Sequence, residues 1–366
     1  MPDTRRDWES YIQRERAALD PILAKLGYTL EDEQPHLLGE RHLTQAVTTA
    51  SGRKLILLGR TRDGWHVVIK ATSDPSGQRE LEHERSCRRV LHEIDFAYEL
   101  FTSPKELFFG RRGRFLISIQ AFIEQESSFL ARPLKEQFAY ALGAFKAQEG
   151  AHATTYGHQR VIRRTFGSLR AADYSRIFGE FLDHLVATRP SDTRLHELMR
   201  RAAALLHENR QSIDQYGGFL THTDFVPHNI RIKDGQIYLL DYSSLRFGNK
   251  YEGWARFVNF MALYNPSLAS ALMQYVRENR TSEESRSLQL MRVYRLGEII
   301  WYYARNALVT EGDLQALTQT RVSFWTDMLE AVLDGKELDQ SRIDTYVQVR
   351  DSLRTEDEKR RQRGLH

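Results

Sequence analysis

Hydrophobic residues near the start of the chain change from helical spacing to short β-type runs. Between residues 4 and 26 they recur mostly at steps of three and four, which predicts an amphipathic helix that Pro21 could divide into two pieces. From residue 36 to residue 71 they form short runs separated by turns that contain glycine. Two hairpins and a three-stranded antiparallel sheet are predicted from these runs, at residues 43–49, 54–58 and 65–70.

The remainder of the chain has a mainly helical pattern with two exceptions. Residues 106–124 predict a hairpin whose second strand continues into an extended link. Alternating apolar residues around Asp234-Gly235 predict a tight hairpin over residues 230–239. Helical spacing is found at residues 78–93, 134–149, 168–188, 193–215 and 255–334.

Two polar side chains flank the hairpin at residues 230–239. Asn229 enters it and Asp241 leaves it, so strand pairing brings both side chains towards one point in space. Asp224 precedes them in the same stretch. An amide oxygen and a carboxylate that converge suit a hard cation such as Mg²⁺, which keeps waters and phosphate oxygens as its other ligands.

The stretch before the hairpin carries a specific motif. Residues 222–230 read His-Thr-Asp-Phe-Val-Pro-His-Asn-Ile, which resembles the catalytic loop of the aminoglycoside phosphotransferase and choline kinase family. Asp241 stands where protein kinases have the Asp of Asp-Phe-Gly. Pro227 and Ile230 favour the small-molecule family over true protein kinases. The resemblance implies an α+β, protein-kinase-like bilobal fold, with a small antiparallel β lobe and a larger, mainly helical lobe.

The resemblance also implies how the chain is divided. Residues 1–35 would form an N-terminal helical extension, residues 36–120 a small nucleotide-binding lobe, and residues 121–354 a large catalytic and substrate lobe. Residues 355–366 are densely charged and predict a disordered tail.

Each residue of the motif has a role that the resemblance implies. Asp224 would accept the proton of a substrate hydroxyl, and His222 would support the loop. Asn229 and Asp241 would hold the Mg²⁺ that bridges the phosphates of ATP.

The small lobe would contribute an ion pair to the phosphates. Lys70 ends a strand that resembles the Val-Ala-Ile-Lys strand of kinases and would hold the α- and β-phosphates. A glutamate of the following helix would orient this lysine. Glu84 is the better match to the family pattern, and Glu80, one helical turn earlier on the same face, is the alternative.

Four further residues are expected near the nucleotide. Ser51 and Gly52 lie where a turn would cover the phosphates, although one glycine does not make a glycine-rich loop. Gln120 and Phe122 lie in the predicted hinge between the lobes, where their backbone groups would hydrogen-bond adenine.

The sequence departs from the family pattern at two places. Ser243 stands where the family often has an acidic residue, which would weaken a second metal site. Tyr251-Glu252-Gly253 replaces the usual helix start, so the acidic residue that braces the catalytic loop is either missing or supplied by Glu252. These departures leave a nucleotide-binding pseudokinase that acts as a scaffold or sensor as an alternative. A protein Ser/Thr kinase ranks lower because no Ala-Pro-Glu segment is recognisable.

Composition narrows the class of protein without naming the acceptor. The 366 residues are 41% hydrophobic and 28% charged, and no apolar run reaches the length of a membrane span. The N-terminus shows no signal peptide, and the single cysteine, Cys87, excludes an internal disulfide; both points favour the cytoplasm. A net charge of +3 is too small to indicate a nucleic-acid partner.

The resemblance implies that the partner is a small molecule with a hydroxyl group, such as an aminoglycoside, an amino alcohol or a sugar, and the sequence sets no oligomeric state. Trp301 or Tyr302 could bind a quaternary amine through cation–π contact, but burial in the core is the commoner reason for such aromatic residues.

Overall fold

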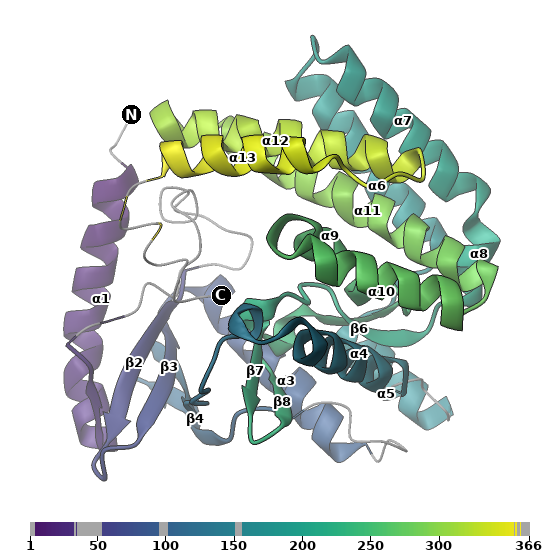
Figure 1. Ribbon diagram of the computed structural model, residues 1–366. Helices are drawn as coiled ribbons and strands as arrows, with labels where there is room; N and C mark the ends of the chain where they lie inside the picture. Colours follow the sequence, from purple (N-terminus) through teal and green to yellow (C-terminus); the bar gives the residue numbers. More distant parts are fainter. Residues whose placement is uncertain are drawn as a thin grey trace.

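The computed structural model describes residues 4–32, 34, 53–94, 102–150, 156–354, 356 and 359. A five-stranded antiparallel sheet and a long helix form one part, and a larger helical region forms the other (Figure 1). The bilobal α+β architecture is the one that the catalytic motif implied. No helix within the described ranges is both long and apolar enough to cross a bilayer.

The sheet has the strand order β1-β2-β3-β5-β4. The hairpin of β2 (Leu55–Thr61) with β3 (His66–Thr72) and that of β4 (Glu106–Arg112) with β5 (Phe115–Ala121) were both predicted. Strand β1 (Tyr28–Leu30) was not; it pairs with β2 and draws part of the predicted N-terminal extension into the sheet. The strand predicted at residues 43–49 lies outside the described residues.

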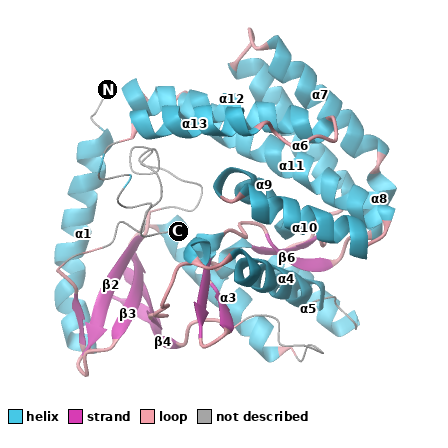
Figure 2. Cartoon of the chain, viewed as in Figure 1, coloured by secondary structure: helices cyan, strands magenta, loops and turns pink. Residues whose placement is uncertain are grey.

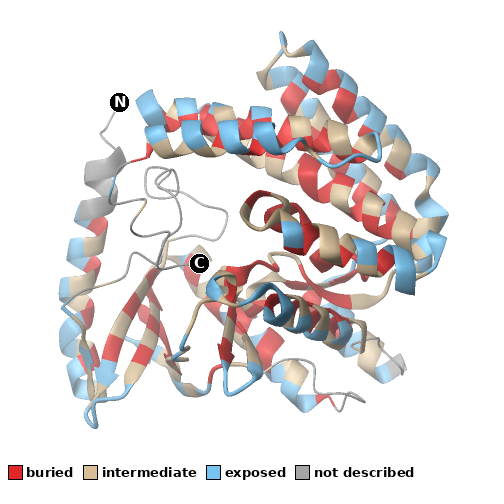
Figure 3. Cartoon of the chain, in the orientation of Figure 1, coloured by how far each residue is buried: buried red, intermediate tan, exposed pale blue. Residues whose placement is uncertain are grey.

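Helix α1 (Thr4–Leu26) covers one face of this sheet and runs through Pro21 without a break. Alternate strand residues such as Leu57, Val67 and Ile69 pack with the helix residues Leu19 and Leu23 in one core. Pro21 lies on the exposed side of the helix, and the leucines on both sides of it are held by the sheet. The alternation of buried and less buried positions along β2 and β3 is visible in Figure 3.

The opposite face of the sheet carries the residues expected near the nucleotide. Strand register pairs Lys70 with Ser118 and Val68 with Gln120, so these four side chains share that face. Helix α3 (Pro75–Glu93) contacts β3 and β5. The side chain of Asp74 caps its first turn by accepting a hydrogen bond from the Gly77 N–H at 2.9 Å.

The helical part follows the predicted order with three differences (Figure 2). Helix α5 (Tyr156–Phe166) was not predicted, and neither was α13 (Gln340–Leu353). The stretch predicted as one helix over residues 193–215 is two, α7 and α8, separated at Asn209. The other helices of this part are α4 (Leu134–Gly150), α6 (Ala171–Thr188), α7 (Thr193–Glu208), α8 (Arg210–Gln215), α9 (Glu252–Tyr264), α10 (Pro266–Asn279), α11 (Ser282–Ala307) and α12 (Gly312–Leu333).

Two short strand pairs hold the candidate catalytic stretch beside these helices. The predicted hairpin is present as β7 (Ile230–Lys233) and β8 (Gln236–Leu239), with Asp234 and Gly235 both at positive φ in its turn. Strand β6 (Phe219–His222) pairs with β9 (Leu245–Gly248). The two loops between these strands, residues 223–229 and 240–244, therefore lie at neighbouring strand ends.

Candidate active site

The ion pair predicted in the small lobe is present. Lys70 Nζ donates to both carboxylate oxygens of Glu84, at 2.6 and 2.8 Å, and both side chains are largely buried. The alternative partner, Glu80, is instead paired with Lys54. Lys70 thus pairs with Glu84 and not with Glu80, although helical periodicity predicted both glutamates on one face of the helix.

His222 joins the two loops of the catalytic stretch. Its side chain is fully buried, and Nε2 donates to the carbonyl oxygens of Leu240 and Asp241, both at 3.0 Å. Thr223 adds two bonds, since its N–H and its hydroxyl both donate to the carbonyl of Ser244, at 2.8 and 2.9 Å. The supporting role predicted for His222 thus has a structural basis in the backbone of Asp241.

Asp224 has charged and amide partners. Both Nε and Nη2 of Arg256 donate to its Oδ1, at 3.0 and 2.9 Å, and Nδ2 of Asn229 donates to its Oδ2 at 3.0 Å. Burial by itself would raise the pKa of this carboxyl, but the nearby charge of Arg256, with His228 and His222, holds the pKa well below its usual range. Asp224 is therefore ionised at neutral pH.

Asp241 has neutral partners and an unusual backbone. Ser243 and Ser244 donate their hydroxyls to its two carboxylate oxygens, at 2.6 and 2.7 Å. Its φ of 54° lies in the left-handed region, which aspartate tolerates better than most residues. Burial would raise its pKa, but the positive charges of His222 and Lys70 and the two hydroxyls lower it.

The donor set fits a hard cation. The amide nitrogen of Asn229 is committed to Asp224, which leaves its amide oxygen to coordinate a cation. The Asp241 carboxylate has about four lone-pair sites, and the two serines use only two of them. The described residues contain no group of three or more His, Cys, Asp and Glu side chains that could enclose a metal. Two protein ligands with open positions are typical of a Mg²⁺ site completed by phosphates and waters.

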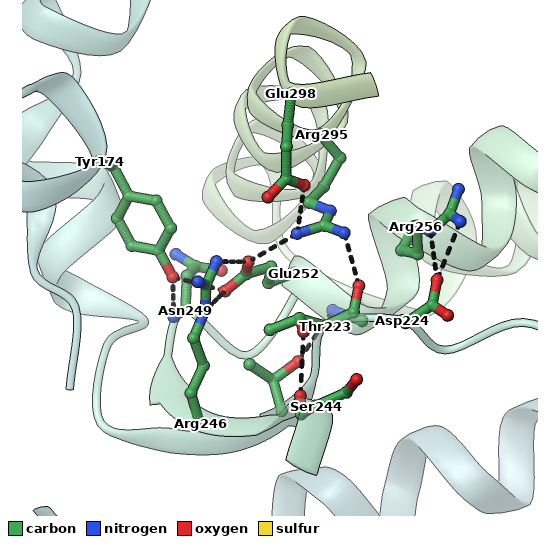
Figure 4. A network of polar contacts seen from close by, with 12 residues as sticks. Tyr174, Thr223, Asp224, Ser244, Arg246, Asn249, Glu252, Arg256, Arg295 and Glu298 are labelled. Atoms are coloured by element: carbon green, nitrogen blue, oxygen red, sulfur yellow. Dashed lines mark hydrogen bonds and ion pairs between the residues drawn. The ribbon is translucent and has the colours of Figure 1, made fainter. Parts of the chain in front are cut away.

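Glu252 braces the catalytic loop, which resolves the choice that the sequence left open (Figure 4). Its side chain is completely buried at the start of α9 and is paired with Arg246 and Arg295. Tyr174 also donates its hydroxyl to Glu252, at 2.8 Å. Arg295 in turn donates from Nη2 to the carbonyl of Thr223 at 2.6 Å, so the charge of Glu252 reaches the residue before Asp224.

Gly253 is required by close packing against the same loop. Its N–H donates to the Thr221 hydroxyl at 2.9 Å. A Cβ atom at this position would lie 2.6 Å from Oε1 of Gln148 and 3.2 Å from the carbonyl oxygen of His222. The absence of a Cβ atom at Gly253 thus lets α9 approach strand β6.

The hinge prediction concerned backbone groups of Gln120 and Phe122, and one of these groups is already engaged at Phe122. Its N–H donates to the carbonyl of His66 at 3.1 Å, because the chain continues to pair with β3 after β5 ends. Gln120 lies in a strand with neighbours on both sides, paired with Val68 and Glu106. The Phe122 N–H is therefore already engaged within the protein, and contact between the other hinge backbone groups and adenine stays a prediction.

Other predicted positions have different outcomes. Ser51 and Gly52 lie outside the described residues. Trp301 stacks on Phe181 with ring centroids 5.0 Å apart, and the guanidinium of Arg305 lies over its ring at 5.7 Å. The packing explanation therefore accounts for Trp301, and the cation nearest its ring is supplied by the protein.

Three arginines of the site were missed by the sequence analysis. Arg246, Arg256 and Arg295 all contact Asp224, Thr223 or Glu252. Arg256 could have been predicted near the loop from the sequence, because it follows Glu252 by one helical turn and lies on the same side of the helix. Arg246 and Arg295 had none, since their contacts depend on how β9 and α11 are placed.

Comparison with solved structures shows the same fold. The aminoglycoside phosphotransferase APH(4)-Ia aligns with a TM-score of 0.59 and 15% identity, over 85% of this chain and 98% of that one. The macrolide 2'-phosphotransferase MphH from Brachybacterium faecium gives 0.54 and 15%, over 83% and 97%. The amicoumacin kinase hAmiN in complex with AMP-PNP, Ca²⁺ and Ami gives a TM-score of 0.54 and 13% identity, over 89% of this chain and 95% of that one.

Sequence comparison gives no corresponding match. No family model matches the chain, and no similar sequence was found among curated proteins. The resemblance inferred from the catalytic motif is thus confirmed at the level of the fold, the bilobal kinase-like fold of small-molecule phosphotransferases.

Proposed function

We propose that this protein is a phosphotransferase that moves the γ-phosphate of ATP to a hydroxyl group of a small molecule. The observation that carries the proposal is the meeting of the two lobes. Helix α3 of the small lobe, whose Glu84 fixes Lys70, contacts residues 242–244 of the large lobe directly after Asp241, and the charge of Lys70 also lowers the pKa of that carboxyl. A lysine and a carboxylate with open coordination sites, brought together from the two lobes, suit the two sides of a polyphosphate.

The fold neighbours support this reading. One structure of APH(4)-Ia contains ADP and hygromycin B, and the amicoumacin kinase contains AMP-PNP and Ca²⁺. Those proteins therefore hold a nucleotide and a hydroxylated acceptor on a similar scaffold. By analogy, ATP would lie between the small lobe and residues 223–244 of this chain.

Each residue then has a defined task. Lys70 binds the α- and β-phosphates, and Glu84 keeps its ammonium group in place. Asn229 and Asp241 hold Mg²⁺, which when bound neutralises the charge on the phosphate oxygens. Asp224 accepts a hydrogen bond from the acceptor hydroxyl and aligns its oxygen with the γ-phosphorus.

The transfer step conserves atoms and charge. The acceptor O–H bond breaks, its proton goes to the Asp224 carboxylate, and the acceptor oxygen forms a new bond to the γ-phosphorus. The bond between that phosphorus and the bridging oxygen breaks, which leaves ADP and a phosphate ester. Because the pKa of Asp224 is lowered, the carboxylate orients the hydroxyl first and takes the proton late in the step.

The test is transfer of labelled phosphate from Mg²⁺-ATP to a panel of hydroxylated metabolites, amino alcohols and aminoglycosides. Asp224→Asn should lower the rate on any accepted compound about 10²- to 10⁴-fold while nucleotide affinity is kept. Asp234→Asn is the matched control, since Asp234 lies exposed in the β7–β8 turn.

Two outcomes would reject the proposal. Equal rates for Asp224→Asn and the wild-type protein would remove Asp224 from the reaction. Nucleotide binding without transfer to any member of a broad panel would favour the pseudokinase alternative, for which the replacement of an acidic residue by Ser243 is the supporting observation.

A further inference from the structure

Arg256 has hydrogen-bonding capacity beyond its contact with Asp224. Two of the five guanidinium N–H groups bind Oδ1 of Asp224, and within the described ranges no protein acceptor binds the other three. The side chain is 19% exposed. Its remaining donors are therefore available to a ligand that enters beside Asp224.

These donors lie where the acceptor has to be. Under the proposed function, the reacting hydroxyl must come within about 2.6–3.2 Å of the Asp224 carboxylate. Nη2 of Arg256 lies 2.9 Å from the same carboxylate. The guanidinium of Arg256 is therefore adjacent to the position that the reacting hydroxyl would occupy.

Helix α9 and the part of α11 that lies next to the loop at residues 223–229 have no unpaired carboxylate that could bind an amine of an acceptor. Helix α9 and residues 285–307 of α11, which both contact the catalytic loop through arginines, contain only two acidic residues. Glu252 is completely buried and paired with Arg246 and Arg295. Glu298 is paired with Arg295 at 2.6 Å. Figure 4 shows these pairs around Thr223 and Asp224.

We propose that Arg256 determines acceptor specificity by binding an anionic group, a carboxylate or a phosphate ester, that lies a few atoms from the reacting hydroxyl. This inference rests on the proposed function and narrows its substrate class. A polycationic aminoglycoside is disfavoured, because its amines would meet guanidinium groups and carboxylates that are already paired. The reaction is the transfer described above, with the anionic group left unchanged.

The experiment compares three acceptors with one carbon skeleton: glycerate, glycerol and 2-aminopropane-1,3-diol. Their dissociation constants are measured by calorimetry on protein saturated with Mg²⁺ and AMP-PNP, and phosphate transfer from ATP is measured in parallel. Wild-type protein should prefer glycerate. Arg256→Gln should weaken glycerate binding about 10- to 100-fold and change glycerol binding little.

Two further variants separate charge from structure. Arg256→Lys keeps the charge and should recover part of the preference for glycerate. Arg292→Gln removes an arginine of the neighbouring helix α11, whose Nε donates to Asn259 at 2.9 Å, and should leave the preference unchanged. A purely structural role for Arg256 would alter all three acceptors alike and would not move the ratio between them.

Several results would overturn the inference. A preference for the amino alcohol or for kanamycin, or no binding of glycerate at millimolar concentration, would contradict an anion site. An equal loss for all three acceptors in Arg256→Gln would assign Arg256 a purely structural role and contradict anion binding. Retained AMP-PNP binding and Asp224-dependent transfer without anion preference would reject only this inference, whereas absent nucleotide binding would reject the proposed function itself.

Discussion

The two loops of the candidate site hold the same type of side chain by different means. In the loop at residues 223–229, Asp224 is bound by a guanidinium and an amide. In the loop at residues 240–244, Asp241 is bound by two serine hydroxyls. Both carboxyls have lowered pKa values, but only Asp224 has its charge balanced by a directly bonded cation.

This difference suits two different tasks. A carboxylate with neutral partners keeps its charge for a metal ion. A carboxylate already paired with an arginine suits a neutral hydroxyl, which it orients without binding a second cation. The surroundings of two aspartates thus assign them separate roles, as happens in other sites with paired acids. Four predictions test this contrast between the loops.

The largest effect is expected at Asp241. Asp241→Asn removes the charge that the loop reserves for a cation, so transfer should fall by about 10³-fold or more, and Mg²⁺ should no longer tighten nucleotide binding. Nucleotide affinity with and without Mg²⁺ gives the measurement. Unchanged Mg²⁺ dependence would contradict the cation-binding role.

A substitution of Glu252 tests how far the loop at residues 223–229 depends on a buried charge. Glu252→Gln leaves Arg246 and Arg295 without their shared partner, which should lower the free energy of unfolding by about 3 kcal/mol. Urea unfolding measures this change. Glu298→Gln is the control, because Glu298 shares Arg295 but is 29% exposed and should cost less than about 1 kcal/mol. Similar losses in both variants would argue against a special role for the buried charge.

Gly253 tests the contact between α9 and the same loop. Gly253→Ala places a methyl group against Gln148 and Thr221, which should destabilise the protein by about 1–3 kcal/mol and slow transfer. At Gly179, inside α6, a Cβ atom would meet nothing within 4 Å, so alanine there should stabilise by up to about 1 kcal/mol. Thermal unfolding should show a lower midpoint for Gly253→Ala and a higher one for Gly179→Ala. An unchanged midpoint in Gly253→Ala would mean that the loop at residues 223–229 moves to accommodate the methyl group.

The smallest effect at neutral pH concerns the ionisation of Asp224. In wild-type protein its lowered pKa keeps it ionised, so it should impose no loss of kcat/KM until the pH falls below about 4. In Arg256→Gln the positive charge that lowers the pKa of Asp224 is removed, while burial still raises that pKa. The acid limb of the pH profile should therefore move to higher pH. Profiles of the variant and of Arg292→Gln give the measurement, and coincident acid limbs would separate Arg256 from the ionisation of Asp224.

Local motifs explain which parts of the site were predictable. The spacing of His222, Asp224, Asn229 and Asp241 lies within one short stretch, and its hairpin is specified by Asp234-Gly235. Glu84 was preferred over Glu80 by its match to the family pattern, and the ion pair with Lys70 agrees. The hinge was harder, because nothing in the sequence shows that strand pairing continues to Phe122 and engages its N–H.

The sequence by itself determined the motif and the hairpin, because these depend on local periodicity and on residues close together in the chain, and the family resemblance of the motif implied the bilobal fold. Only the tertiary structure decided which charges surround each aspartate. Arg295 reaches Thr223, and Arg256 reaches Asp224, from helices that lie far from the catalytic loop in sequence. Ion pairing depends on distance in space and on burial, and a linear pattern contains neither of these quantities.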